Sequence, residues 1–165
     1  MNRPELYKRT VDILFQAYFK DELEHQNCYA CAVGNLVAAN MGYTMMTTKG
    51  DMIRFVWKDR IPFWDAVFVS CGDNEQSRYP DNYKEEAKVE IDSTGYRWRE
   101  LAMIEESFEK AYTYEDNDEE MFNGLCNVLE TLKQIHQVED NTEDVSRFQT
   151  HYSSKKQKHE QTGAL

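Results

Sequence analysis

A helical period of apolar residues runs through the first part of the chain. Pro4 suits the first turn of a helix, because its missing N–H needs no partner there. Charged residues fall between the apolar ones, while Phe15 and Phe19 widen the apolar arc, so we expect contacts on two sides. The pattern therefore predicts a helix over residues 4–24. Its apolar stripe is Leu6, Thr10, Ile13, Leu14, Ala17 and Tyr18.

The next segment, "CYACAVGNLVAAN", is apolar nearly all round and rich in small residues. Such a helix is normally buried, and Gly34 and the alanines allow a neighbouring element to approach closely. Asn27 has the side chain of an N-cap, which accepts a free first-turn N–H. Gly42 is the expected stop. The sequence predicts a buried second helix that runs from Asn27 to about Asn40.

Residues 43–79 show no clean period. "DMIRFVW" and "FWDAVFVSC" flank "KDRIP" and are consistent with a hairpin of two aromatic strands. The second piece is equally consistent with a short buried helix around Asp65. We therefore expect an irregular or hairpin element over residues 43–72.

The helical pattern returns at Pro80. A charged helix, "PDNYKEEAKVEID", is closed by Gly95, and a second, "YRWRELAMIEESFEKAY", carries one apolar face. Asp118 is the expected cap of a last helix that ends near His136, and the chain becomes polar after Val138. We predict a mainly α fold: a single-domain bundle of about five helices over residues 1–138 and a flexible tail over 139–165. The apolar face of the second helix is Trp98, Leu101, Ile104, Phe108 and Ala111, and that of the last is Phe122, Leu125, Leu129 and Leu132.

Length and charge restrict the function. The chain has 165 residues, enough for one core without disulfides, and a formal net charge of −11. Negative charge repels phosphate backbones, so direct nucleic-acid binding is not expected. The N-terminus lacks the apolar run of a signal peptide, and no uncharged run approaches the roughly 18–20 residues that span a bilayer. We expect a cytoplasmic protein that does not enter a membrane.

Three short stretches carry a resemblance to other proteins. "CAVGNLVAANMGY", "IDSTGY" and "EEMFNGL" together resemble uncharacterised short proteins from Bacteroidetes-type genomes and their bacteriophages. The resemblance covers roughly residues 5–137. That family has no known activity, so the resemblance implies no catalytic residue. It favours a small viral or host-interaction protein over a housekeeping enzyme.

One candidate for chemistry is a histidine and two cysteines at three-residue intervals, His25, Cys28 and Cys31. Zinc takes four N or S ligands, a Cys-x2-Cys pair at a helix start often supplies two, and Cys71 would be the fourth. The same pair is the geometry of thiol oxidoreductases, but that fold needs a preceding strand, and here a long helix precedes. Buried cysteines also pack as small hydrophobes. Zinc, a redox pair and plain core packing all stay open, and no other cofactor is expected.

Other catalytic and metal-binding patterns are missing. Glu22 and His25 form one Glu-x2-His step, but a di-iron bundle needs that step twice. The acidic run from Asp116 lacks the glycine and glutamate of a calcium loop. Glu105, Glu106 and Glu109 show no apolar pocket in the sequence, and there is no phosphate-binding loop or nucleophile elbow. We therefore do not expect an enzyme.

The middle segment is dense in methionine and aromatic residues, which are usual in cores but are also enriched at binding surfaces. We therefore predict a small acidic interaction protein that binds an unidentified protein partner through its acidic surface or through this segment. A structural zinc domain is the alternative, and a thiol redox protein is the second alternative. The predicted partner-binding residues are Met45, Met46, Trp57, Phe63 and Trp64.

Overall fold

The computed structural model describes residues 2–27, 29–43, 46–48, 51–53, 79 and 85–163. This part of the chain contains six helices and one pair of antiparallel strands, so the prediction of a mainly helical fold is confirmed. In chain order the elements are α1 (Arg3–Phe19), α2 (Ala32–Met41), β1 (Met46–Thr48), β2 (Asp51–Ile53), α4 (Glu85–Thr94), α5 (Trp98–Glu109), α6 (Asp118–His136) and α7 (Thr142–Gly163).

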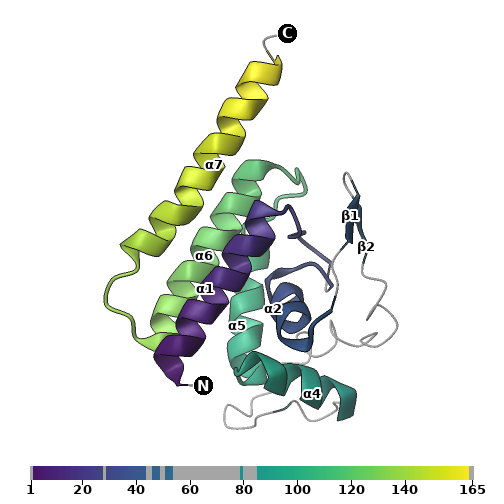
Figure 1. Cartoon of the computed structure of the whole chain (residues 1–165), viewed down its shortest axis with the longest axis vertical. Coiled ribbons are helices and arrows are strands. Elements are labelled where there is room, and N and C mark those ends of the chain that lie inside the picture. The colour runs from purple at the N-terminus through teal and green to yellow at the C-terminus, as the bar shows by residue number, and fades with distance from the viewer. Residues whose placement is uncertain are drawn as a thin grey trace.

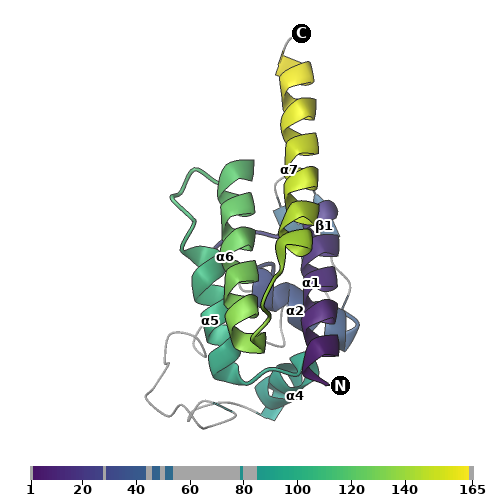
Figure 2. The ribbon, with the colours of Figure 1, turned by 90° about the vertical axis from the view of Figure 1, so that its left-hand side faces the viewer.

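Helix α6 lies at the centre of the bundle. It packs most extensively against α5 and also contacts α1 and α7, while α2 packs against α1, α4 and α5 (Figures 1 and 2). The N-terminus lies near α4 at one end of the bundle. The C-terminus lies at the opposite end, where α7 continues past the ends of α1 and α6 (Figures 1 and 2).

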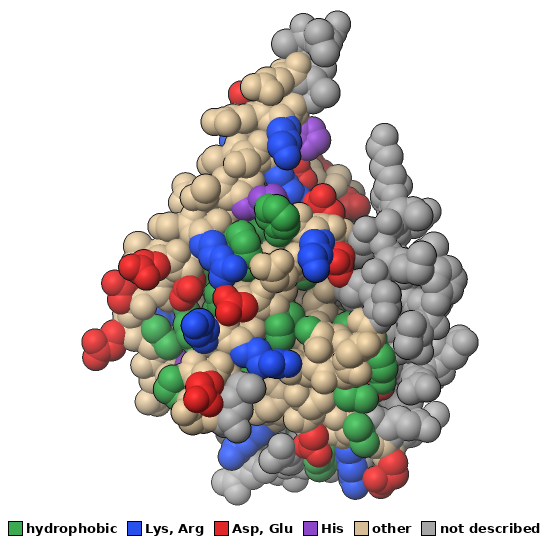
Figure 3. Space-filling view, viewed as in Figure 1, with side chains coloured by type: hydrophobic (Ala, Val, Ile, Leu, Met, Phe, Trp, Pro, Cys, Tyr) green, Lys and Arg blue, Asp and Glu red, His purple; other side chains and the backbone are tan. Residues whose placement is uncertain are grey.

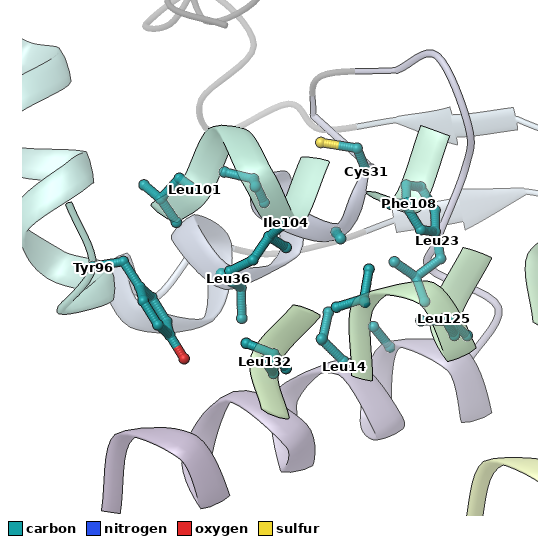
Figure 4. Packing of buried hydrophobic residues seen from close by; sticks show 14 of the residues in the cluster. Leu14, Leu23, Cys31, Leu36, Tyr96, Leu101, Ile104, Phe108, Leu125 and Leu132 are labelled. Carbon is teal, nitrogen blue, oxygen red and sulfur yellow. The ribbon is translucent and has the colours of Figure 1, made fainter. Parts of the chain in front are cut away.

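One apolar core contains buried side chains from all six described helices, including Ile91 of α4 and Phe148 of α7. Leu14 of α1, Leu36 of α2 and Leu132 of α6 point into the same interior (Figure 4). Ile104 and Phe108 of α5 complete it and are fully buried. The period of three and four residues that predicted these helices puts their apolar residues on the faces that meet here. Most positions that the pattern assigned to the core of α1, α5 and α6 are buried, whereas Ile13, Ala111 and Phe122 are only partly buried. The buried ones include Leu6, Tyr18, Trp98, Leu101, Leu125 and Leu129.

Helix α1 ends five residues before the predicted boundary. Asn2 caps its start, and its side chain accepts the Glu5 N–H at 2.9 Å. At the other end Asp21 adopts a φ of +55°, and the Glu22 N–H donates to the Ala17 carbonyl at 2.8 Å. A left-handed residue at this point turns the chain away from the helix axis.

Helix α2 begins later than predicted, and its N-cap is Cys31, not Asn27. The Asn27 side chain instead accepts the Tyr29 N–H at 3.0 Å and so closes a turn before the helix. Gly42 ends the helix with a φ of +74°, as predicted. The sequence pattern was correct about the helix and its stop, but wrong about its first turn.

Strands β1 and β2 pair antiparallel, with Met46 opposite Ile53. The hairpin predicted from "DMIRFVW" and "FWDAVFVSC" would be a different pairing, and it stays a prediction because "FWDAVFVSC" lies outside the described residues. Near the other end of the chain, Asn117 caps α6 in place of Asp118, and its side chain accepts the Glu120 N–H at 2.9 Å.

Residues 142–163, expected to be a flexible tail, form α7. Phe148 is fully buried and lies 5.4 Å from Phe15 and 6.0 Å from Tyr18, measured between ring centroids. Tyr152 stacks on Phe122 at 4.4 Å. Two aromatic residues four positions apart therefore dock an otherwise polar helix, and average composition does not reveal such a narrow stripe.

Candidate functional site

The structure places His25 in a buried aromatic sandwich. Its side chain is 1% exposed, and its ring stacks on Phe108 at 4.2 Å and on Tyr112 at 5.3 Å, measured between ring centroids. Phe108 belongs to the apolar face of α5, and Tyr112 lies just after the end of that helix. Neither ring nitrogen of His25 has a hydrogen-bond partner in the described part of the chain. The sequence identified this histidine but not what surrounds it.

Gly124 of α6 lies against this sandwich. A Cβ atom added there would lie 2.9 Å from the Phe108 carbonyl oxygen and 3.0 Å from His25 Cε1. These distances are shorter than ordinary van der Waals contact, so only glycine lets α6 approach α5 and His25 this closely. The glycine inside the predicted last helix was the signal that could have revealed this contact.

Two glutamates of α5 face the segment that leads from α1 to α2. Glu109 accepts the Gln26 N–H with both carboxylate oxygens, at 2.8 and 3.0 Å, and its Oε2 lies 3.6 Å from His25 Nδ1. Gln26 has a φ of +57°, which a non-glycine residue rarely adopts. Glu109 therefore anchors a strained turn and also brings a carboxylate close to His25.

Glu105, one turn earlier on α5, faces Cys31. Burial raises the pKa of the Glu105 carboxyl to about 8, against the effect of a hydrogen bond with Cys31, and the nearby Glu109 carboxylate adds to the rise. The pKa of the Cys31 thiol is also raised, first by burial and then by the charge of Glu105. Both groups therefore hold their protons more strongly than in water.

Cys31 has a local structural role. Its Sγ accepts the Gly34 N–H at 3.2 Å and so caps the first turn of α2. Asn35 completes this end of the helix, because its Nδ2 lies 2.9–3.1 Å from three backbone carbonyls, those of Glu22, Ala30 and Cys31. The sequence analysis did not single out Asn35, although one asparagine in a nearly apolar helix was a usable signal.

The predicted zinc ligands are described only in part. Cys28 and Cys71 lie outside the described residues. His25 contacts α5 at Phe108 and Glu109, whereas Cys31 contacts it one turn earlier, at Glu105. Within the described ranges no group of three His, Cys, Asp or Glu residues could hold a metal ion. The redox alternative also depends on Cys28, and the raised pKa of Cys31 opposes the thiolate that such chemistry uses.

The predicted partner-binding residues lie mainly in the undescribed middle segment. Met45, Trp57, Phe63 and Trp64 are outside the described residues, and Met46 is described only as the first residue of β1. The prediction that this segment binds a partner stays a prediction.

A second candidate site is an open groove between α1 and α2, with a volume of about 760 Å³. Small side chains, Ala17, Ala38 and Ala39, line it between the larger Ile13 and Tyr43. On this face of the molecule hydrophobic side chains lie between Lys, Arg, Asp and Glu side chains (Figure 3). Its volume is within the range of pockets that bind ligands. The remaining lining residues are Glu5, Lys8, Arg9, Asp12, Gln16, Lys20, Glu22 and Asn35.

A buried chain of hydrogen bonds lies at the other side of α1. Thr10 Oγ1 donates its one hydrogen to the Leu6 carbonyl at 2.8 Å. The Tyr96 hydroxyl therefore donates to Thr10 Oγ1 at 2.7 Å, and because its hydrogen is then used, His136 Nε2 donates to the Tyr96 oxygen at 2.8 Å. The Tyr96 hydroxyl points towards α1 in Figure 4. His136 Nδ1 has no hydrogen-bond partner in the described part of the chain. Burial lowers the pKa of His136, and Arg3 adds to the effect.

Comparisons with known proteins give the chain no relatives. No protein-family model matches it, and no curated protein or solved structure is significantly similar to it. Among the helices described here, none combines the length and the apolar character needed to cross a membrane. The functional argument therefore depends on the geometry of the two candidate sites.

Proposed function

We propose that this chain is a non-enzymatic interaction protein, and that it binds the apolar face of a helix from a protein partner in the α1–α2 groove. The observation that carries the proposal is the groove itself, whose lining combines three alanines with six charged side chains. Helices commonly dock in this way, with their apolar face in a groove. The resemblance to short phage and Bacteroidetes-type proteins fits a host-interaction role.

Local charge also supports this groove as the docking site. The chain has a net charge of −11, whereas three acidic and three basic side chains line the groove. An acidic partner is repelled less strongly here than by the molecule as a whole, and interfaces are depleted of unbalanced charge at their centres.

The test is capture of the partner from cells that naturally contain the protein, with two matched variants. Ala39 is exposed and lines the groove, so Ala39→Arg fills it without disturbing the core. Ser153 is exposed on α7, away from the groove, so Ser153→Arg is the control. We expect a stoichiometric protein that the unmodified chain and Ser153→Arg recover and Ala39→Arg loses. A partner that Ala39→Arg still binds, or no partner at any salt concentration, would refute the proposal.

The zinc-stabilised domain is the second candidate, and the burial of His25 favours it. A buried imidazole whose nitrogens lack hydrogen-bond partners is a ready metal ligand. Cys28, Cys31 and Cys71 would be the other ligands. Elemental analysis should then find one equivalent of zinc, and Cys28→Ser should lower both the zinc content and the melting temperature. Purified protein with well under one equivalent of metal would eliminate this candidate.

A further inference from the structure

Two lysines stand near the ends of the α1–α2 groove. Lys8 and Lys20 both line it, both are exposed, and neither forms an ion pair in the described ranges. They are twelve residues apart, with Lys8 inside α1 and Lys20 at its C-cap, which corresponds to about 18 Å along the helix axis. The groove therefore presents two separate cationic side chains to any ligand that lies along α1.

The acidic residues of the lining have partners within the chain. Asp12 accepts a hydrogen bond from Arg147 at 2.7 Å, which neutralises its charge from outside the groove. Glu5 accepts the Asn2 N–H at 3.3 Å at the start of α1, where the helix dipole also attracts it. Arg9 donates to the neutral side chain of Asn40 and so keeps its positive charge. With Arg147 included, four basic side chains accompany the three acidic ones, so the groove carries a small positive excess, in contrast to the acidic chain.

The shape of the groove suits an elongated ligand. Its lining extends along α1 from Glu5 to Lys20, about 22 Å at the rise of an α-helix. Ala17, Ala38 and Ala39 are the small apolar side chains of its lining, and together they are called its floor here. A helix of four turns has the same length, and its apolar side chains would reach this floor while its polar edge stays near the lysines.

We infer that the partner's binding segment is an acidic amphipathic helix that lies along α1, with two carboxylates about three turns apart paired to Lys8 and Lys20. The inference rests on the proposed function and specifies its ligand. Carboxylates eleven residues apart in the partner lie on one helical face about 16 Å apart, which the flexible lysine side chains can span. The apolar face of the partner supplies buried area, and the two charge pairs set its direction and register.

The test uses two synthetic 18-residue helical peptides with the same alanine and leucine face. One carries Glu at positions 4 and 15, and the other carries Lys at both positions. Each peptide is titrated into the ¹⁵N-labelled full chain, and amide shifts are followed by NMR. We expect the Glu peptide to shift amides along the groove, near Ile13, Ala38 and Tyr43, and to bind about tenfold more tightly than the Lys peptide.

Charge reversal checks the same contacts from the side of the protein. The double variant Lys8→Glu/Lys20→Glu should weaken binding of the Glu peptide about tenfold and should favour the Lys peptide. The control is Lys110→Glu/Lys156→Glu, which makes the same change of net charge at two exposed positions that do not line the groove. The control should leave the preference for the Glu peptide intact.

Three results would overturn the inference. Equal binding of both peptides to the groove would show apolar docking without charge recognition. No groove shifts with millimolar Glu peptide would exclude an acidic helical ligand, and groove shifts that grow with protein concentration alone would identify a second copy of the chain as the occupant. The proposed function fails by a different result, namely a captured partner that Ala39→Arg still binds.

Discussion

Replacing Gly124 by alanine should destabilise the protein, although the same change inside a helix normally stabilises it. Alanine has the higher helix propensity, by about 1 kcal/mol in an exposed helix interior. At this position, however, the added Cβ would lie 2.9 Å from the Phe108 carbonyl oxygen and 3.0 Å from His25 Cε1. The carbonyl belongs to the backbone of α5, so α5 and α6 must separate to admit the methyl group.

The expected size follows from these two opposing effects. Overpacking a core typically costs about 1–3 kcal/mol. Because α5 and α6 form the largest helix contact of the bundle, the separation also loosens their other contacts. We therefore expect a cost in the upper part of this range, about 2–3 kcal/mol. After the gain of about 1 kcal/mol in propensity, the net loss is about 1–2 kcal/mol, which corresponds to a fall in melting temperature of about 2–8 °C for a chain of this size.

Urea denaturation followed by circular dichroism measures this change, with the midpoint compared at constant slope. The control is Asn123→Ala, in the same helix at an exposed position, which should raise the midpoint slightly through propensity alone. In a His25→Ala background Gly124→Ala should cost less, because one of the two close contacts is gone. The reasoning is refuted if Gly124→Ala raises the midpoint as Asn123→Ala does.

Three further predictions concern buried polar groups. Asn35→Ala removes the side-chain amide that lies within hydrogen-bond distance of three backbone carbonyls. We expect it to lower the free energy of unfolding, measured by urea denaturation, by about 1–3 kcal/mol, whereas Asn123→Ala should not lower it. The pKa of Glu105 is raised to about 8 in the folded protein, so the free energy of unfolding should fall as pH rises from about 4.5 to about 8. Glu105→Gln should flatten that fall, and a variant with an unchanged pH profile would contradict this prediction. The pKa of His136 is lowered in the folded protein, so the free energy of unfolding should fall as pH drops below about 6.5. His136→Gln should reduce this fall at acid pH, and a variant that loses stability below about pH 6.5 as the unmodified chain does would argue against the prediction.

The sequence identified part of the candidate site. His25 and Cys31 stood out because of their spacing, and both are buried where α2 begins. Their neighbours on α5 did not stand out, since Glu105 and Glu109 resemble the solvated glutamates of any charged helix. Nothing in the local pattern shows that α5 turns these two carboxylates towards a segment about eighty positions earlier.

Apart from α7, local pattern determined which segments are helical and which face of most of these helices is buried. The period of apolar residues and the stop at Gly42 depend on neighbours within a few positions, so the sequence specifies them directly. The tertiary structure decided where α2 starts, why Gly124 must be glycine, and how α1 and α2 form a groove. Those features depend on distances between elements far apart in the chain. Such distances are set by how whole helices pack, and no short stretch of sequence contains them.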